Sequence, residues 1–168
     1  RCAAFFALGI AQQTLKPVAL VCTSGSALLN YYPAIAEAYY SQIPLVVISA
    51  DRPAHLIDIG DGQTIRQENV FKNHILYSAN LKEFDAENSI KALSKAFSIL
   101  RQVKGPIHIN APFDEPLYET VATMNDFCFI AEESDFQDTI DYENLASQWN
   151  SAKKKMILVG VHSPNAAL

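Results

Sequence analysis

PLVVISA, at residues 44–50, is the stretch that decides the fold class. The run is apolar or small throughout, is rich in β-branched residues and begins at a proline. A short continuous apolar run of this kind is typical of a strand that is buried on both faces of a parallel sheet. Similar runs at 17–23 (PVALVCT) and 106–111 (PIHINA) predict two further strands of this kind, and 74–78 predicts a weaker one.

Helical patterns lie between the predicted strands. Residues 2–15 are apolar nearly all round, which predicts a buried helix. Residues 27–41 predict a second helix, in which Pro33 makes the first turn or two irregular. Residues 89–102 carry apolar side chains at a spacing close to 3.6 and predict a third helix, and 63–71 predicts a short one. The alternation predicts an α/β fold, a parallel sheet with helices on both faces.

The character of the chain changes beyond the last of these strands. Acidic residues become frequent and no clear period survives, which predicts a surface connector at 119–143 whose charges form a solvated face. Residues 144–154 then predict a helix and 155–161 (KMILVGV) a strand. We therefore expect an incomplete first domain at 1–118 and the start of a second α/β domain at 144–168. Both ends look cut, so we expect an interior piece of a longer protein.

Composition excludes several classes of partner. The net charge of −5 disfavours nucleic acid and anionic membranes, because both attract basic surfaces. No apolar run approaches the roughly 20 residues of a membrane helix. Cys2, Cys22 and Cys128 show no metal-ligand spacing, and Cys22 is expected to be a buried free thiol. The odd cysteine count favours a reducing compartment, the cytoplasm.

The first candidate site is the segment Ser24-Gly25-Ser26, between a predicted strand and the next helix. In open α/β sheets, ligands bind at the carboxyl ends of the strands. Small hydroxyl residues and a glycine there can offer backbone N–H groups to an anion and let a ring lie close. The alternative is that Ser24 or Ser26 only caps the helix, which this segment alone favours. The chain has neither a GxGxxG motif nor a Walker lysine.

The second candidate is Arg52, which follows the strand at 44–50. Pro53 favours an extended backbone at Arg52, which could aim the guanidinium into a cleft. A planar guanidinium is suited to bidentate capture of a carboxylate. A local ion pair with Asp51 or Asp58 that orders a turn is an equally good interpretation of the spacing.

The histidines point to packing rather than to a metal site. His108 alternates with isoleucines in a predicted strand and is expected to be a satisfied packing residue. The other histidines have no partner at metal-ligand spacing. From the residues alone, the chain is an α/β domain with an arginine at a possible anion-binding cleft.

SADRPAHLIDIGDGQTIRQENVF, at residues 49–71, resembles the signature of the 2-succinyl-5-enolpyruvyl-6-hydroxy-3-cyclohexene-1-carboxylate synthase family. The family pattern has ADRP, then Leu, Gly, Gln, Ile-x-Gln and Phe. In this sequence these are 50–53, Leu56, Gly60, Gln63, Ile65-Arg66-Gln67 and Phe71. The resemblance extends over about residues 1–118, through pieces that would also fit related thiamine-diphosphate enzymes.

The resemblance implies a fold and an activity. The chain would be most of a pyrimidine-binding domain from a thiamine-diphosphate-dependent enzyme of menaquinone synthesis. That enzyme decarboxylates 2-oxoglutarate on its cofactor and adds the product to isochorismate. The family's catalytic glutamate would lie just before Arg1, and the domain that holds the diphosphate and Mg²⁺ would also lie outside this chain. The implied full-length enzyme is a homodimer or homotetramer.

The resemblance also assigns residues. Arg52 matches the family's substrate-carboxylate arginine, and Gln63 matches a polar residue beside the reacting intermediate. Ser24, Gly25 and Ser26 would line the cofactor side of the cleft. This chain has Gly62 where the family often has Asn, so it departs from the pattern at that contact.

Two other functions fit the residues. Another thiamine-diphosphate decarboxylase or an acetohydroxyacid synthase would share the domain, but the pattern around Arg52 and Gln63 speaks against it. A non-catalytic α/β module that binds an anion or a partner protein would need no cofactor motif elsewhere in its sequence.

Overall fold

Four parallel strands form a single sheet at the core of the fold. The structure is a computed structural model that describes residues 1–114, 118, 120, 122–123 and 140–160. The chain divides into two units, 1–132 and 133–168. The sheet lies in the first unit in the order β1-β2-β4-β3. Its strands are β1 (Val18–Cys22), β2 (Leu45–Asp51), β3 (Tyr77–Asn80) and β4 (Ile107–Pro112).

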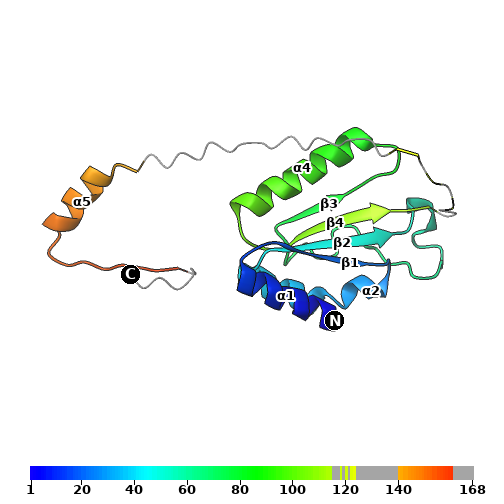
Figure 1. Cartoon of the computed structure of the whole chain (residues 1–168), viewed down its shortest axis with the longest axis horizontal. Coiled ribbons are helices and arrows are strands. Elements are labelled where there is room, and N and C mark those ends of the chain that lie inside the picture. The colour runs from blue at the N-terminus through cyan, green and yellow to red at the C-terminus, as the bar shows by residue number, and fades with distance from the viewer. Residues whose placement is uncertain (115–117, 119, 121, 124–139, 161–168) are drawn as a thin grey trace. The chain divides into compact units, whose positions relative to one another are not determined.

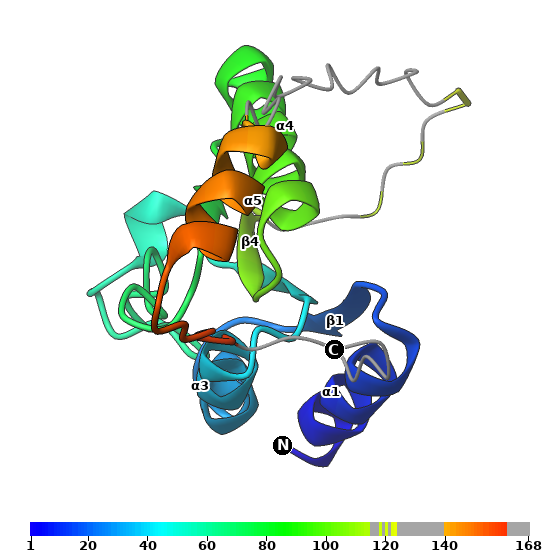
Figure 2. The ribbon, with the colours of Figure 1, turned by 90° about the vertical axis from the view of Figure 1, so that its left-hand side faces the viewer.

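Helices cover both faces of this sheet, as the alternation of patterns predicted. Figure 1 shows α4 on one side of the strands and α1 on the other, and Figure 2 shows α3 on the same side as α1. Parallel neighbours need a crossover connection, and helices supply it here. The helices of this unit are α1 (Cys2–Thr14), α2 (Ser26–Leu29), α3 (Tyr32–Tyr40), the short 3-10 turn η1 (Ala54–Leu56) and α4 (Ala86–Gln102).

The two faces of β2 and β4 differ in chemistry. Val46, Ile107 and Ile109 are buried against α4 in an apolar cluster. The opposite face of the same strands carries polar side chains, which are buried as well: Ser49, Asp51, His108 and Asn110. Residues alternate between the faces of a strand, and the register places Val47 beside His108 and Ser49 beside Asn110. The polar residues therefore form one row. His108 is buried in it, as predicted for a packing residue, but the expectation that its polar atoms are satisfied was wrong for Nδ1, which has no hydrogen-bond partner among the described residues.

The strands predicted at 17–23, 44–50 and 106–111 are present as β1, β2 and β4, but the burial expected for β1 was wrong on one face. Every residue of β2 is buried or half-buried, whereas Val21 in β1 is 70% exposed. Val21 is in register with Ile48 and lies on the α4 face of the sheet, but α4 packs on β3 and β4, on the far side of β2, so burial on both faces was wrong for β1. Helix α1 was also expected to be buried all round. It buries one face through Ala4, Ala7, Leu8 and Ala11, and Phe6 on its other face is 74% exposed.

Backbone geometry explains the other differences. The helix predicted at 27–41 is interrupted ahead of Pro33, as expected, and forms α2 and α3. The short helix predicted at 63–71 is absent, because positive φ angles at Gln63 (54°) and Asn69 (55°) break it into turns. The weak strand predicted at 74–78 is present as β3, but it begins later, at Tyr77, and ends at Asn80.

The second unit confirms one prediction and contradicts another. The helix predicted at 144–154 is α5 (Tyr142–Ser151). Residues 155–160 form no strand, since the described part of this unit, 140–160, holds no other strand to pair with. Val161 and most of the predicted connector lie outside the described residues. No helix in the described ranges is long and apolar enough to span a bilayer.

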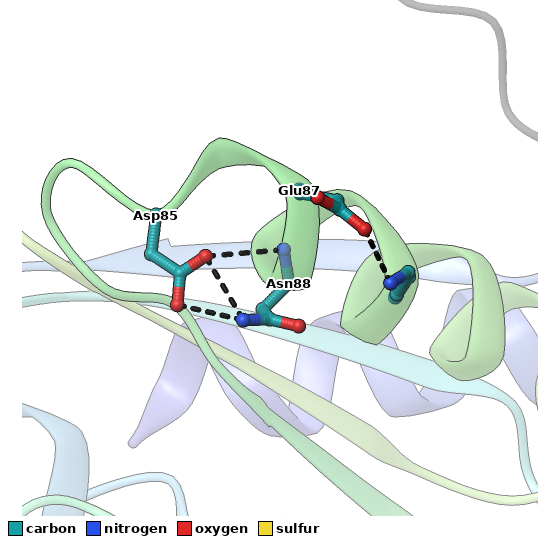
Figure 3. Close-up of polar contacts among 4 residues, drawn as sticks. Asp85, Glu87 and Asn88 are labelled. Carbon is teal, nitrogen blue, oxygen red and sulfur yellow. Dashed lines mark hydrogen bonds and ion pairs between the residues drawn. The ribbon is translucent and has the colours of Figure 1, made fainter.

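Aspartate caps begin both long polar helices. The Asp85 carboxylate accepts a hydrogen bond from the Asn88 backbone N–H at 3.3 Å, and the Asn88 side chain donates to both of its oxygens (Figure 3). These hydrogen bonds from Asn88 hold the pKa of Asp85 below its usual value. Asp141 caps α5 in the same way through the N–H of Asn144, at 3.0 Å. The caps satisfy N–H groups that the first turn of a helix cannot pair.

The buried histidine predicts acid sensitivity. Burial lowers the pKa of His108 from 6.5 to about 4, so the unfolded chain binds a proton between these values and the folded chain does not. The folded state is therefore not penalised by the neutral His108 above pH 6.5. Its free energy of unfolding decreases as the pH falls from 6.5 toward 4, because protons then bind the unfolded chain. We expect the urea midpoint to fall between pH 7 and pH 5, and to fall less in His108→Gln. The exposed His55, changed to Gln, is the matched control. If the urea midpoint fell by the same amount between pH 7 and pH 5 in the native protein, His108→Gln and His55→Gln, the prediction would be contradicted.

Candidate functional site

The two segments singled out in the sequence meet at the carboxyl ends of the strands. Gly25 follows β1 and has a φ of +76°, which favours glycine. A Cβ atom at Gly25 would lie 2.7 Å from the carbonyl oxygen of Gln63. A residue with a side chain therefore cannot replace Gly25 without moving the Gln63 backbone. The loop after β1 and the loop after β2 are in direct contact.

Gln67 joins these loops to the sheet. Its side chain is fully buried, and its Oε1 accepts a hydrogen bond from the Gly25 N–H at 3.1 Å. Its Nε2 donates to the carbonyl oxygen of Ala50 at 2.6 Å and to Oδ1 of Asn110 at 2.7 Å. One amide thus ties the loop after β1, the end of β2 and the end of β4 together.

The polar row on the sheet continues this network. Ser49 Oγ lies 2.7 Å from Nε2 of His108 and donates to Oδ1 of Asn110 at 2.9 Å. Asn110 Nδ2 donates to Oδ2 of Asp51 at 2.7 Å, and Asp51 Oδ1 accepts from the Arg52 N–H at 2.8 Å. The backbone of Arg52 is therefore held through Asp51 and Asn110, and Asn110 through Gln67.

The Arg52 side chain is half-buried beside an aspartate that the sequence reasoning missed. Nε and Nη2 of Arg52 lie 3.0 Å and 2.9 Å from the same oxygen, Oδ2 of Asp61. The ion pair expected with Asp51 or Asp58 was assigned to the wrong carboxylates, because Asp51 binds the Arg52 backbone instead. Asp58 pairs with Arg66 at 3.0 Å. The turns between residues 58 and 63 bring Asp61 back over Arg52, which spacing alone cannot show.

Arg52 lines a pocket of about 520 Å³ at this edge of the sheet. Side chains of both charges and two amides line it with Arg52, among them Asp51, Glu68, Asn80, Lys82 and Asn110. A larger pocket of about 680 Å³ lies at the other end of the strands, between residues that precede them such as Pro17 and Pro44. That pocket is mainly apolar and lies away from Arg52, so the smaller pocket is the candidate site.

The predicted cofactor segment, 24–26, is not among the described residues that line the Arg52 pocket, and its glycine meets the loop after β2 instead. Gly25 begins the four-residue helix α2, and no side chain caps that helix, so capping by Ser24 or Ser26 was wrong. Ser24 is buried, Ser26 is exposed, and the Gly25 N–H is taken by Gln67. Gly25 therefore permits close packing of two loops and does not offer its amide to an anion.

Gln63 is exposed at the same edge of the sheet, and its backbone lies against Gly25. Gln67, four residues later, belongs to the Ile-x-Gln part of the signature, but the sequence predicted no role for it. A glutamine in a motif can be buried or exposed, and the motif does not distinguish the two.

The described residues at this edge include one cysteine, Cys22, and no cluster of metal ligands. Across 1–114 and the other described positions, no group of three acidic, histidine or cysteine side chains is placed to hold a metal ion. Cys22, at the end of β1, is a half-buried free thiol. Burial raises its pKa, so it is protonated near neutral pH and is a poor nucleophile.

Comparison with known proteins agrees with this architecture. Residues 1–77 match the family described as thiamine pyrophosphate enzyme, N-terminal TPP binding domain. The chain is 61% identical over 166 residues to the 2-succinyl-5-enolpyruvyl-6-hydroxy-3-cyclohexene-1-carboxylate synthase of Flavobacterium psychrophilum, covering 98% of this chain and 30% of that protein. The synthase of the same name from Christiangramia forsetii is 56% identical over 189 residues, covering 99% and 32%. That from Desulfotalea psychrophila is 43% identical over 180 residues, covering 100% and 33%.

The chain spans about a third of the length of these curated relatives, and the similarity extends over nearly the whole of this chain. The parallel sheet with helices on both faces is consistent with the matched domain. Residues 1–77 therefore belong to the thiamine pyrophosphate enzyme N-terminal domain family, and nearly the whole chain is similar to part of the 2-succinyl-5-enolpyruvyl-6-hydroxy-3-cyclohexene-1-carboxylate synthases.

Proposed function

We propose that the full-length protein carrying this chain is a thiamine-diphosphate-dependent carboligase of menaquinone synthesis. It decarboxylates 2-oxoglutarate and adds the product to isochorismate. The observation that carries the proposal is Arg52, held at the carboxyl edge of the sheet beside a pocket of about 520 Å³. The name of the relatives, at up to 62% identity, supports the same substrates.

Arg52 would bind a substrate carboxylate. Nε and Nη2 contact Asp61 through a single oxygen, so Asp61 holds one edge of the guanidinium and sets its direction. Arg52 would thus orient the substrate while its own backbone is fixed by Asp51. Gln63, exposed at the same edge, would supply a polar contact to the reacting groups.

The residues described here fit one side of a thiamine-diphosphate site. Ser24, Gly25 and Ser26 form a tight turn of small residues whose central amide is satisfied from within, which suits a wall against a ring. The cofactor would supply the electron sink for decarboxylation and carbon–carbon bond formation. The Mg²⁺ ion and the diphosphate would be held by residues outside this chain. We further propose a cytoplasmic homodimer or homotetramer.

The alternatives differ in their substrates. Another thiamine-diphosphate decarboxylase or an acetohydroxyacid synthase would use the same domain without dependence on isochorismate. A non-catalytic module would release no carbon dioxide with any of these substrates. The names of the relatives favour the carboligase over both.

Substitution of Arg52 tests the proposal. In the full-length protein with thiamine diphosphate and Mg²⁺, we expect Arg52→Ala to lower kcat/KM for 2-oxoglutarate roughly 10- to 100-fold. This is the range expected for losing charge-assisted hydrogen bonds to a carboxylate. The measurement is isochorismate-dependent release of carbon dioxide. Arg66→Ala is the matched control, because Arg66 is also paired with an aspartate but its side chain is 84% exposed.

Two results would count against the proposal. If the protein is active but Arg52→Ala equals Arg66→Ala, Arg52 only orders the loop. If carbon dioxide release does not depend on isochorismate, another thiamine-diphosphate enzyme is the better assignment.

Removing the charge of Asp61 should have a smaller effect. Both partners of the ion pair are about a quarter exposed, and such pairs contribute at most about 1 kcal/mol, or about fivefold. We expect Asp61→Asn to raise the KM for 2-oxoglutarate by up to about fivefold, with kcat nearly unchanged. Asp58→Asn, at the exposed pair with Arg66, is the control. A lower KM in Asp61→Asn would show instead that Asp61 competes with the substrate.

A further inference from the structure

We propose that Gln67 is a positioning residue for the reaction, which acts through Arg52 and through the turn at Gly25. The proposal rests on the function proposed above. Gln67 would set the distance between the arginine that binds the substrate carboxylate and the small-residue wall on the cofactor side. Neither the signature in the sequence nor the likeness to known proteins assigns this role.

The orientation of the Gln67 amide is determined by its partners. Two acceptors, the carbonyl oxygen of Ala50 and Oδ1 of Asn110, lie 2.6 Å and 2.7 Å from Nε2, and the Ser49 hydroxyl lies 3.1 Å from it. A backbone N–H, that of Gly25, lies 3.1 Å from Oε1. With oxygen and nitrogen exchanged, the contacts with Ala50, Asn110 and Gly25 would each place two donors or two acceptors together. The amide therefore has one orientation, and both of its ends are used.

The network leads from Gln67 to Arg52 in three steps. Gln67 Nε2 holds Oδ1 of Asn110, and Nδ2 of Asn110 holds Asp51 at 2.7 Å. Asp51 accepts the Arg52 N–H at 2.8 Å. Asn110 cannot flip, because its oxygen faces the donor of Gln67 and its nitrogen faces a carboxylate. A change at Gln67 is therefore transmitted to the backbone of Arg52.

The same side chain controls the other wall of the site. Gly25 can approach the Gln63 backbone because it has no Cβ, and the Gln67 acceptor holds its N–H in that place. An apolar residue at position 67 would fill the space but remove the Gln67 partner of this N–H and of the Ala50 carbonyl, and would leave Asn110 Oδ1 with Ser49 as its donor. Efficient packing alone does not require an amide here. Oε1 of Gln67 binds the turn at Gly25, and Nε2 binds β4 and β2, the strand that leads to Arg52. This use of both polar atoms points to a positioning role.

The experiment uses the full-length protein with three variants. Gln67→Met removes donor and acceptor but keeps the side-chain length. Gln67→Glu keeps the acceptor for Gly25, and can donate to Ala50 or Asn110 only when it is protonated. Gln102→Met is the matched control, because Gln102 is exposed near the end of α4. Each is measured for kcat, for KM with 2-oxoglutarate and for thermal unfolding, alone and combined with Arg52→Lys.

We expect Gln67→Met to raise the KM for 2-oxoglutarate roughly tenfold in the native background, the loss expected when buried hydrogen bonds are removed. In the Arg52→Lys background the same change should raise KM less than about twofold, because residues acting through one interaction are not additive. Gln67→Glu should regain kcat/KM relative to the native enzyme as the pH falls from about 8 to about 6, since burial favours protonation of its carboxyl. Gln102→Met should match the native enzyme throughout.

Other results would overturn the inference. A Gln67→Met effect that is equally large in both Arg52 backgrounds, or that follows the loss of thermal stability, would make Gln67 structural only. So would a Gln67→Glu variant whose activity shows the native pH profile. If Arg52→Ala itself leaves isochorismate-dependent release unchanged, the proposed function fails first. If Arg52→Ala reduces that release while the Gln67 and Arg52 effects add, only the inference about Gln67 fails.

Discussion

The parallel pairing of β2 with β4 is the constraint on which the rest of the first unit depends. The register sets Val47 beside His108 and Ser49 beside Asn110. Residues in register on neighbouring strands point to the same face of a sheet, so their polar side chains gather in one row. A buried polar row must be satisfied from within the protein, and the loop after β2 supplies Gln67 for this purpose. The loop after β2 therefore follows a path that brings the Gln67 side chain to the polar row, and the Gly25 N–H pairs with the same side chain.

The two faces of the sheet contribute in different ways. On the α4 side, Val46, Ile107 and Ile109 bury apolar surface, which stabilises the fold without directing any side chain toward a ligand. On the other side, each amide has partners of only one kind at each end. Such a network specifies one arrangement of its members, because any flip or shift leaves buried groups unpaired. The polar face therefore fixes the positions of particular side chains, whereas the apolar face mainly stabilises the fold.

This division places the candidate site at a rigid edge. Arg52 has its backbone fixed by Asp51 and its guanidinium directed by Asp61, while the pocket beside it stays open. Catalytic geometry is held best by groups whose own positions are locked by surrounding hydrogen bonds. The chain thus offers a directed cation and a wall of small residues. In the proposed enzyme, the diphosphate and the metal would be held elsewhere.

The apolar run of β2 and the alternation of strand and helix were enough to predict the fold class. Both are visible in the sequence, because the spacing of buried apolar residues along the chain differs between strands and helices. The run of β1 is as apolar as that of β2, yet Val21 is exposed, because α4 covers that face of the sheet over β3 and β4, and the strand order places β1 on the far side of β2 from them. The signature around Arg52 indicated its position, but Asp61 became its partner through turns that spacing does not encode. Gln67 meets Gly25, Ala50 and Asn110, which are 42, 17 and 43 residues away in the chain. Only the tertiary structure brings them together, because a hydrogen bond depends on distance in space and leaves no period in the sequence.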